Sequence, residues 1–309
     1  MLPGVKTFAS KLAKVLTCLK MDHAATGNRW GAVAERNVIM QPQATAGERA
    51  VKVRIADEIR MQIERGELPP GAPIPTIQDL TKAWNVSPRT ARDAHQLLRQ
   101  MGLVTGRRGS PLKVRTPRHM TIRSSDRHQI EKDLVLRPET ERAQTGTSEL
   151  EMQTPIDNFR FGCTAERIPA REPLADVLGV APGTELLQRT FTKADRTTGA
   201  LHEWSVSWIP VDLIKGNPDI IDKADQPWPG GTQHQLHTVG IEIVRIVDEV
   251  TGAMPTTVDQ QLWDLEDGVP FLRVRRISID DQDRVVEVSD AVFPADRTKL
   301  IFNTPLAKW

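Results

Sequence analysis

The feature that most constrains the fold is a proline-rich break at residues 67–75, which separates two stretches of helical character. Three prolines fall between positions 69 and 73, and no helix passes through them because proline lacks a backbone N–H and clashes with the preceding turn. Before the break, aliphatic side chains recur at every fourth residue, which predicts one buried helix face. These side chains are Val51, Ile55, Ile59 and Ile63. Gly66 is typical of a helix end, so the first helix is expected from about residue 48 to residue 66.

Two more helices are predicted after the break from their capping residues. Thr76, with Asp79 three residues later, is a variant of the capping box and begins a short second helix. Ser87 is a typical N-cap for a third helix, and Gly102 is typical of its end. The predicted inner face of this third helix consists of Ala91, Ala94, Leu97, Leu98 and Met101.

Charge separates the chain into two parts. Residues 48–118 carry 14 Lys/Arg and 7 Asp/Glu, net +7, whereas residues 155–309 carry 16 and 24, net −8. Two apolar runs, 103–105 and 112–114, flank a basic turn and predict a β-hairpin. Three helices followed by a basic hairpin are the elements of a winged helix-turn-helix, whose third helix enters a DNA groove. The side chains expected to face DNA are Arg89, Thr90 and Arg92 on the third helix, and Arg107 and Arg108 on the hairpin.

The remaining sequence completes a four-part organisation. The predicted segments are an N-terminal extension at 1–47, a winged helix-turn-helix at 48–115, a polar linker at 116–130 and a second domain at 131–309. Within the last segment, short β-like runs alternate with turns and a few short helices, which predicts an α+β domain with a mainly antiparallel sheet. The expected strands are 185–192, 203–208, 241–250, 271–279 and 285–292, with helices at 174–178 and 257–265.

The extension contains an apolar pattern of helical spacing at residues 5–19. This helix could contact a membrane surface or a partner, or it could add to the fold. Alternatively, these residues lie upstream of the true start, since Met21 and Met40 are possible initiators. We assign no function to this segment.

A family resemblance appears in five stretches of the basic part, at residues 65–71, 74–76, 86–87, 90–92 and 102–104. Through them, residues 50–115 resemble the DNA-binding domain of the GntR family of bacterial transcription regulators. The resemblance implies phosphate and base contacts by Thr76, Gln78, Ser87, Thr90, Arg92 and Gly109. Gln78 and Pro88 stand where the family usually has arginine, and Pro111 replaces a glycine of the wing, which indicates a lower phosphate affinity and a stiffer hairpin tip.

The acidic part carries a second resemblance, at residues 178–184, 207–210, 250–256, 269–276 and 285–297. With these stretches, residues from about 130 to 309 resemble the UTRA ligand-sensing domain of the HutC-type branch, whose fold is related to chorismate lyase. The resemblance implies a receptor for a small, often anionic metabolite. The implied effector contacts are Arg189, Ser205, Ser207, Glu287 and Asp290. The alternative is that the charged members of this set form Arg–carboxylate pairs that brace the sheet.

Together these patterns predict a cytoplasmic, homodimeric repressor that binds double-stranded DNA at an inverted repeat and responds to a small anionic metabolite. No cofactor, metal or membrane partner is expected, and His234 and His237 are interpreted as part of a surface loop. Two alternatives stay open: a DNA-binding protein with a purely structural second domain, and a chorismate-lyase-like enzyme. The enzyme is disfavoured because no carboxylate pair, catalytic triad or metal-ligand set can be assembled from the sequence.

Overall fold

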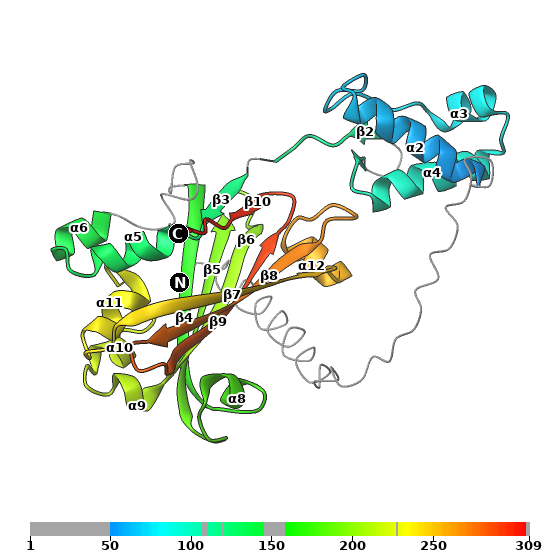
Figure 1. Ribbon diagram of the computed structural model, residues 1–309. Helices are drawn as coiled ribbons and strands as arrows, with labels where there is room; N and C mark the ends of the chain where they lie inside the picture. Colours follow the sequence, from blue (N-terminus) through cyan, green and yellow to red (C-terminus); the bar gives the residue numbers. More distant parts are fainter. Residues whose placement is uncertain (1–49, 107–109, 119, 145–157, 227, 307–309) are drawn as a thin grey trace. The chain divides into compact units, whose positions relative to one another are not determined.

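The computed structural model describes residues 50–106, 110–118, 120–144, 158–226 and 228–306 (Figure 1). The expected N-terminal extension and the hairpin residues Arg107, Arg108 and Gly109 lie outside the described residues. The chain divides into two compact units. The first unit contains the described residues up to Arg115 together with Thr256–Gln261, and the second contains the remainder.

The first unit has the predicted order of three helices and a hairpin. Its elements are α2 (Val51–Glu64), α3 (Ile77–Trp84), α4 (Pro88–Gln100), β1 (Val104–Thr105) and β2 (Lys113–Val114), with β1 and β2 antiparallel. The Thr76–Asp79 capping box is formed, and Ser87 caps α4 by accepting from the Thr90 amide. Asn85 ends α3 in the left-handed conformation, with φ of 50°, which allows the tight turn into α4.

The core of the first unit comes from the predicted faces of its helices. The fully buried side chains include Ile55, Ala91, Ala94 and Leu98. Met101 was also expected on this inner face, but it is 45% exposed. α4 ends at Gln100, so Met101 is the C-cap residue and lies past the last helical residue, at the end of the buried face.

The second unit is built on a six-stranded sheet in the order β4-β5-β6-β9-β8-β7, with every neighbouring pair antiparallel. Its strands are β4 (Phe159–Pro169), β5 (Glu185–Asp195), β6 (Leu201–Pro210), β7 (Ile243–Ala253), β8 (Phe271–Asp280) and β9 (Val285–Pro294). Five of the six were expected from the sequence. The sixth, β4, is an edge strand exposed along most of its length, so it has no apolar alternation to predict it.

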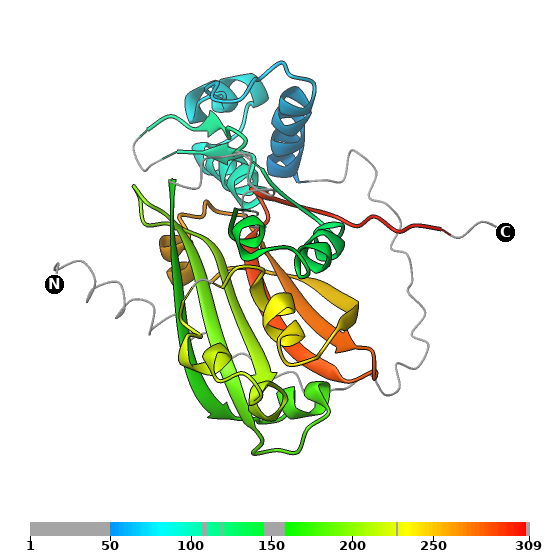
Figure 2. The ribbon, with the colours of Figure 1, turned by 90° about the vertical axis from the view of Figure 1, so that its left-hand side faces the viewer.

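Short helices complete the second unit, and α5 and α11 lie over one face of the sheet (Figure 2). Among the described residues, these helices are α5 (Arg127–Leu134), α6 (Glu139–Gln144), α8 (Leu174–Leu178), α9 (Val211–Ile214), α10 (Asp219–Asp222) and α11 (Gly231–His237). A further helix, α12 (Thr257–Leu262), lies almost entirely in the segment that belongs to the first unit. The interpretation of His234 and His237 as loop residues was wrong, because both lie on α11.

The segment expected as a polar linker, residues 116–130, is largely ordered. It contains β3 (Thr121–Ser124), which pairs in parallel with β10 (Thr298–Ile301), and it continues into α5. This pairing joins residues about 180 positions apart, so local composition could not reveal it. We call residues 120–134, which form β3 and α5, the connector.

Candidate DNA interface and ligand pocket

The exposed side of α4 carries two arginines near its N-terminus. Arg89 and Arg92 are exposed, while Ala91 between them is fully buried. Within the described part of the chain, neither arginine forms an ion pair with a carboxylate. Ser87 Oγ accepts from the Thr90 amide at 3.1 Å and lies 3.0 Å from Thr90 Oγ1. We call residues 87–92 the α4 face; its charges are available for phosphates or base edges.

The two DNA contacts expected from the second helix, Thr76 and Gln78, are exposed at the start of α3. Thr76 Oγ1 donates to Asp79 Oδ2 at 2.6 Å and accepts from the Asp79 amide at 3.2 Å. The hydrogen bond from Thr76 Oγ1, together with one from the Thr76 amide to Asp79 Oδ2 at 2.9 Å, lowers the pKa of Asp79, so its carboxylate is charged at neutral pH. Because the Thr76 hydroxyl hydrogen is already used in the capping box, Gln78 is the better placed of the two to donate to a base.

Arginine side chains attach the hairpin to the end of α4. Arg99 Nη2 donates to Gly106 O at 3.0 Å, and Arg115 Nη1 donates to Gly102 O at 3.5 Å. Lys113 on β2 is exposed. The hairpin is therefore held against the helix that carries the α4 face.

The second unit contains a cavity of about 570 Å³, a volume suited to a small molecule. Its floor is the face of the sheet formed by β5, β6, β7, β8 and β9, including Phe191, Ser205 and Ser207. Its walls come from the connector, from α6, and from the turn at residues 228–231 that leads into α11. We call this cavity the pocket.

Arg189 lies beside the pocket, covered by α11, rather than on the cavity surface. Its side chain is 3% exposed and does not line the cavity. Nη2 donates to Glu287 Oε1 at 3.0 Å and to Thr232 Oγ1 at 3.0 Å, Nε donates to Ser207 Oγ at 3.2 Å, and Nη1 donates to Gln235 Oε1 at 2.5 Å. Burial lowers the pKa of Arg189, and the charge of Glu287 opposes this effect. Arg189 thus joins three strands to α11 in one hydrogen-bond network.

The implied effector contacts divide into two groups. Ser205, Ser207 and Glu287 line the pocket, and the hydrogen bonds of Arg189 reach two of them. Asp290 does not line it: the flanking residues of β9 face the cavity, so Asp290 points to the opposite side of the sheet. There it accepts two hydrogen bonds of 2.8 Å from Arg275, which form a half-buried ion pair. All three charged candidates, Arg189, Glu287 and Asp290, therefore occur in Arg–carboxylate pairs that brace the sheet.

Ion pairs that no local sequence pattern indicated lie between the connector and the sheet. Arg123 on β3 meets Glu203 on β6 at 3.0 Å. Burial alone would raise the pKa of Glu203, but Arg123 and other neighbouring cations hold it below its ordinary value. His128 on α5 lies 3.4 Å from Asp248, which also accepts two hydrogen bonds of 2.8 Å and 2.9 Å from Arg276.

The contacts among His128, Asp248 and Arg276 decide which of these side chains are charged. Burial opposes the charge of Asp248, but the hydrogen bonds from His128 and Arg276 hold its pKa well below the ordinary range. Burial lowers the pKa of His128 in spite of the neighbouring carboxylate, so the ring is neutral at pH 7. The connector is therefore fixed to the pocket by one arginine pair and one neutral histidine.

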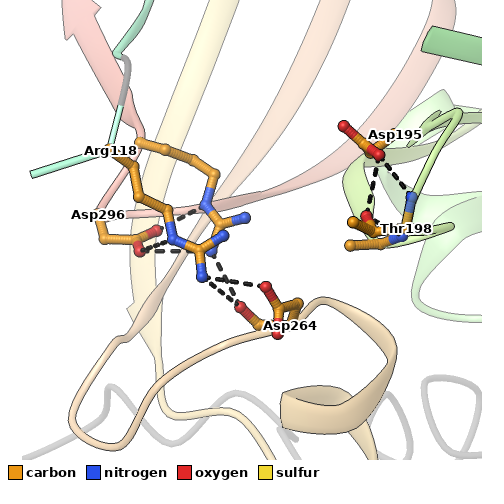
Figure 3. Close-up of polar contacts among 7 residues, drawn as sticks. Arg118, Asp195, Thr198, Asp264 and Asp296 are labelled. Carbon is orange, nitrogen blue, oxygen red and sulfur yellow. Dashed lines mark hydrogen bonds and ion pairs between the residues drawn. The ribbon is translucent and has the colours of Figure 1, made fainter. Parts of the chain in front are cut away.

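A third anchor lies just before the connector. Figure 3 shows Arg118 between two acidic residues: Nη2 donates to Asp264 O and Oδ2, both at 3.1 Å, and Nε lies 3.7 Å from Asp296 Oδ2. The same view shows the turn between β5 and β6, where Asp195 Oδ1 accepts from the Thr198 amide at 2.7 Å. Only two residues separate Arg118 from Arg115, the end of the first unit.

Two family models match the chain at the places where these sites lie. The model described as bacterial regulatory proteins of the gntR family matches residues 51–114, and the UTRA domain model matches residues 162–299. The chain belongs to the GntR family. The combination with UTRA agrees with the HutC-type branch, which confirms both resemblances and the predicted fold class. The match assigns this GntR-family chain to regulatory proteins rather than to enzymes, as expected.

Individual relatives agree with this assignment. An HTH-type transcriptional regulator of Rhizobium meliloti is 24% identical over 252 residues, which cover 81% of this chain and 93% of the relative. One from Streptomyces coelicolor is 25% identical over 247 residues, covering 79% and 88%. The crystal structure of a GntR-family transcriptional regulator superposes with a TM-score of 0.62 at 21% identity, covering 84% of this chain and 99% of the other, which shows a shared fold.

The described residues offer neither a metal site nor a membrane-spanning helix. No group of three or more His, Cys, Asp or Glu side chains in them is arranged to hold a metal ion. None of their helices combines the length and apolar character needed to span a membrane.

Proposed function

We propose that this GntR-family chain is a cytoplasmic, homodimeric transcription repressor that leaves an inverted-repeat operator when a small metabolite occupies the pocket. The observation that carries the proposal is the composition of the pocket wall. Connector residues such as Arg123, Ser125 and His128 line the cavity, and the connector follows the DNA-binding unit directly in the chain. A ligand in the pocket would therefore touch the segment that leads to the DNA-binding unit.

The DNA-binding role rests on the α4 face. Arg89 and Arg92 are exposed and free of acidic partners among the described residues, and Ala91 packs the helix against the core behind them. Arginine can form two hydrogen bonds to guanine or to a phosphate, so either residue can position the helix or read a base. We assign base and phosphate contacts to Gln78, Ser87, Arg89, Thr90 and Arg92, with a cap role for Thr76, and to Arg107, Arg108 and Gly109 on the hairpin tip.

A dimer follows from the size of the DNA-binding unit. A single winged helix-turn-helix of this length covers one short half-site, and one module has a small interface. Two copies bound to half-sites one helical turn apart would add their contacts, which favours an operator with inverted symmetry.

Ligand control follows from differential affinity. A ligand changes the operator affinity only if it binds more tightly to the arrangement of the protein that does not fit DNA. The contacts Arg123–Glu203 and His128–Asp248 fix the connector and also border the pocket, so a ligand that displaces or reinforces them would shift that equilibrium.

The test is a binding titration with the full chain and a labelled DNA fragment from upstream of its own gene. We expect salt-sensitive binding, two protomers per fragment by sedimentation, and release on addition of a small-molecule extract of the host. Binding that does not respond to any fraction of the extract would favour a purely structural second unit. Failure to bind any fragment of the genome at low ionic strength would refute the DNA-binding role.

A further inference from the structure

The arginine expected to meet an anionic ligand, Arg189, is buried and already neutralised by Glu287. Two arginines that do line the pocket are neutralised as well: Arg123 by Glu203, and Arg276 by Asp248. A ligand anion would have to compete with these carboxylates.

Arg142 on α6 is in a different situation. It lines the pocket, and its hydrogen bonds go to backbone carbonyls: Nε donates to Pro229 O at 3.3 Å and Nη1 donates to Arg137 O. Among the described residues, no carboxylate lies within ion-pair distance of it, and none of them accepts a hydrogen bond from Nη2. Its charge is therefore held at the pocket without a counter-ion among the residues that the structure describes.

The turn beside Arg142 is shaped to hold its side chain. A Cβ atom at Gly230 would lie only 2.9 Å from Arg142 Cδ, and Gly230 has a φ of +91°. Glycine thus allows the arginine stem to lie against the turn while Pro229 O fixes its guanidinium. A guanidinium held in this way loses little further side-chain freedom when it binds a ligand.

Hydroxyl groups in the same pocket can complete an anion site. Thr232, three residues after Pro229 and so within about 10 Å of it, lines the cavity and accepts a hydrogen bond from Arg189. Ser207 also accepts from Arg189 and lines the cavity. Because each oxygen is used as an acceptor, each hydroxyl hydrogen can be donated to a ligand.

We propose that Arg142 binds an anionic group, a carboxylate or a phosphate, of the ligand, and that Arg189 is a positioning residue that orients the hydroxyls of Ser207 and Thr232 toward it. This inference rests on the proposed function, since it concerns the ligand of the same pocket. It assigns the recognition of the ligand's anionic group to Arg142 on α6, beside the turn at 228–231, rather than to Arg189 at the centre of β5. A planar guanidinium with free donors suits two-point binding of either anion.

The test uses inorganic phosphate and acetate as separate probes, titrated calorimetrically into the full chain at constant ionic strength. The variants are Arg142→Gln and, as a matched control with the same loss of charge, Arg137→Gln, since Arg137 is exposed and does not line the pocket. We expect the wild type to bind one or both anions, and whichever binds more tightly identifies the group. Arg142→Gln should weaken that binding at least about tenfold, while Arg137→Gln changes it less than about twofold.

Three results would overturn the assignment: a wild type that binds neither anion, an Arg142→Gln variant that binds like the wild type, or equal losses in both variants. Thermal unfolding verifies that both variants are folded. Operator release by the host extract is measured in parallel and separates this inference from the proposed function. If the extract still releases the Arg142→Gln variant from the operator as it releases the wild type, the role of Arg142 is refuted while the proposed function stands. If the extract fails to release even the wild type, the proposed function fails, while the calorimetric difference still supports an anion site.

Discussion

The α4 face and the sheet of the second unit both carry arginines, but in opposite electrostatic states. On α4, Arg89 and Arg92 project from an exposed helix with no acidic partner among the described residues. In the second unit, Arg189 is buried and paired with Glu287, and Arg276 is held by Asp248. Exposed unpaired charge favours an external polyanion, because nothing internal competes with it. Buried paired charge instead fixes strands and helices in place.

This difference determines how each region should respond to substitution. Removal of an exposed arginine takes away a contact with DNA and leaves the fold nearly unchanged. Removal of one member of a buried pair leaves the other charge without compensation in a site that water cannot reach, so the fold itself is destabilised.

The largest effect is expected for Glu287→Ala, which leaves Arg189 buried without its carboxylate. We expect a loss of about 3–5 kcal/mol in the free energy of unfolding of the second unit. Denaturant unfolding followed by tryptophan fluorescence measures it, because four of the five tryptophans among the described residues lie there, at positions 204, 208, 228 and 263. Asp290→Ala is the control on the same strand, because Asp290 belongs to the half-buried pair with Arg275. An equally large loss of unfolding free energy in this variant would contradict the idea that full burial of the pair sets the size of the effect.

A double variant, Arg189→Met with Glu287→Leu, sharpens the same point. Replacing a whole buried pair by apolar side chains is often neutral, so most of the lost stability should return. The operator should still be bound, but release by the host extract should be impaired, because Ser207 and Thr232 lose the donor that orients them. Normal release from this folded variant would show that Arg189 has no positioning role.

The next largest effect is expected for Arg92→Ala on the α4 face. Operator binding should weaken by about 1–3 kcal/mol without a change in the unfolding transition. If Arg92 contacts a phosphate, the slope of log K against log salt should also fall by about one. Arg65→Ala removes the same charge from the end of α2 as a control. Equal weakening by both variants would mean that only net charge matters.

A smaller effect is expected for Thr76→Ala, which removes the capping box of α3. The first unit should lose about 1 kcal/mol of stability. Amide hydrogen exchange of α3 and α4 measures this loss locally, without interference from the second unit. Unchanged protection in α3 would show that the cap adds nothing to its stability.

The smallest effect is expected from the pH dependence of the second unit. Burial, with further contributions from Arg297 and Lys193, lowers the pKa of His202 to about 4. Since this is below the value in the unfolded chain, the unfolded chain takes up the proton first, and stability is lost as the pH falls from about 6.5 toward 4. Thermal unfolding of wild type and His202→Phe between pH 7.5 and 5.5 tests this. The unfolding temperature of His202→Phe should decline less steeply with falling pH than that of the wild type. Parallel declines would exclude His202 as a source of the pH dependence.

Local signals allowed much of the first unit to be predicted. Capping at Thr76 and Ser87, the glycine after α2 and the aliphatic spacing each depend on residues within one or two helical turns. The α8 helix was also predicted with its observed bounds. Met101 was wrong because the apolar spacing was extended past the last helical residue.

The pocket was less predictable because its walls come from distant parts of the chain. The pairs Arg123–Glu203 and Arg276–Asp248 join strands far apart in sequence, and nothing near Arg142 indicates that α6 borders a cavity. The separate position of Asp290 follows from the sequence alone. Glu287 and Asp290 are three residues apart on a strand, so they face opposite sides of the sheet and cannot share one site.

The parallel pairing of β3 with β10 has a practical consequence for engineering. The segment by which the chain enters the sensing unit is hydrogen-bonded to the segment by which it leaves, with Thr121 opposite Thr298. A hybrid regulator that receives this sensor should therefore be joined near Pro117 and must retain the tail through Ile301. A tail shortened before Thr298 would remove the strand that pairs with β3. The transferred sensing unit could then still bind its metabolite but no longer control the DNA-binding domain to which it is fused.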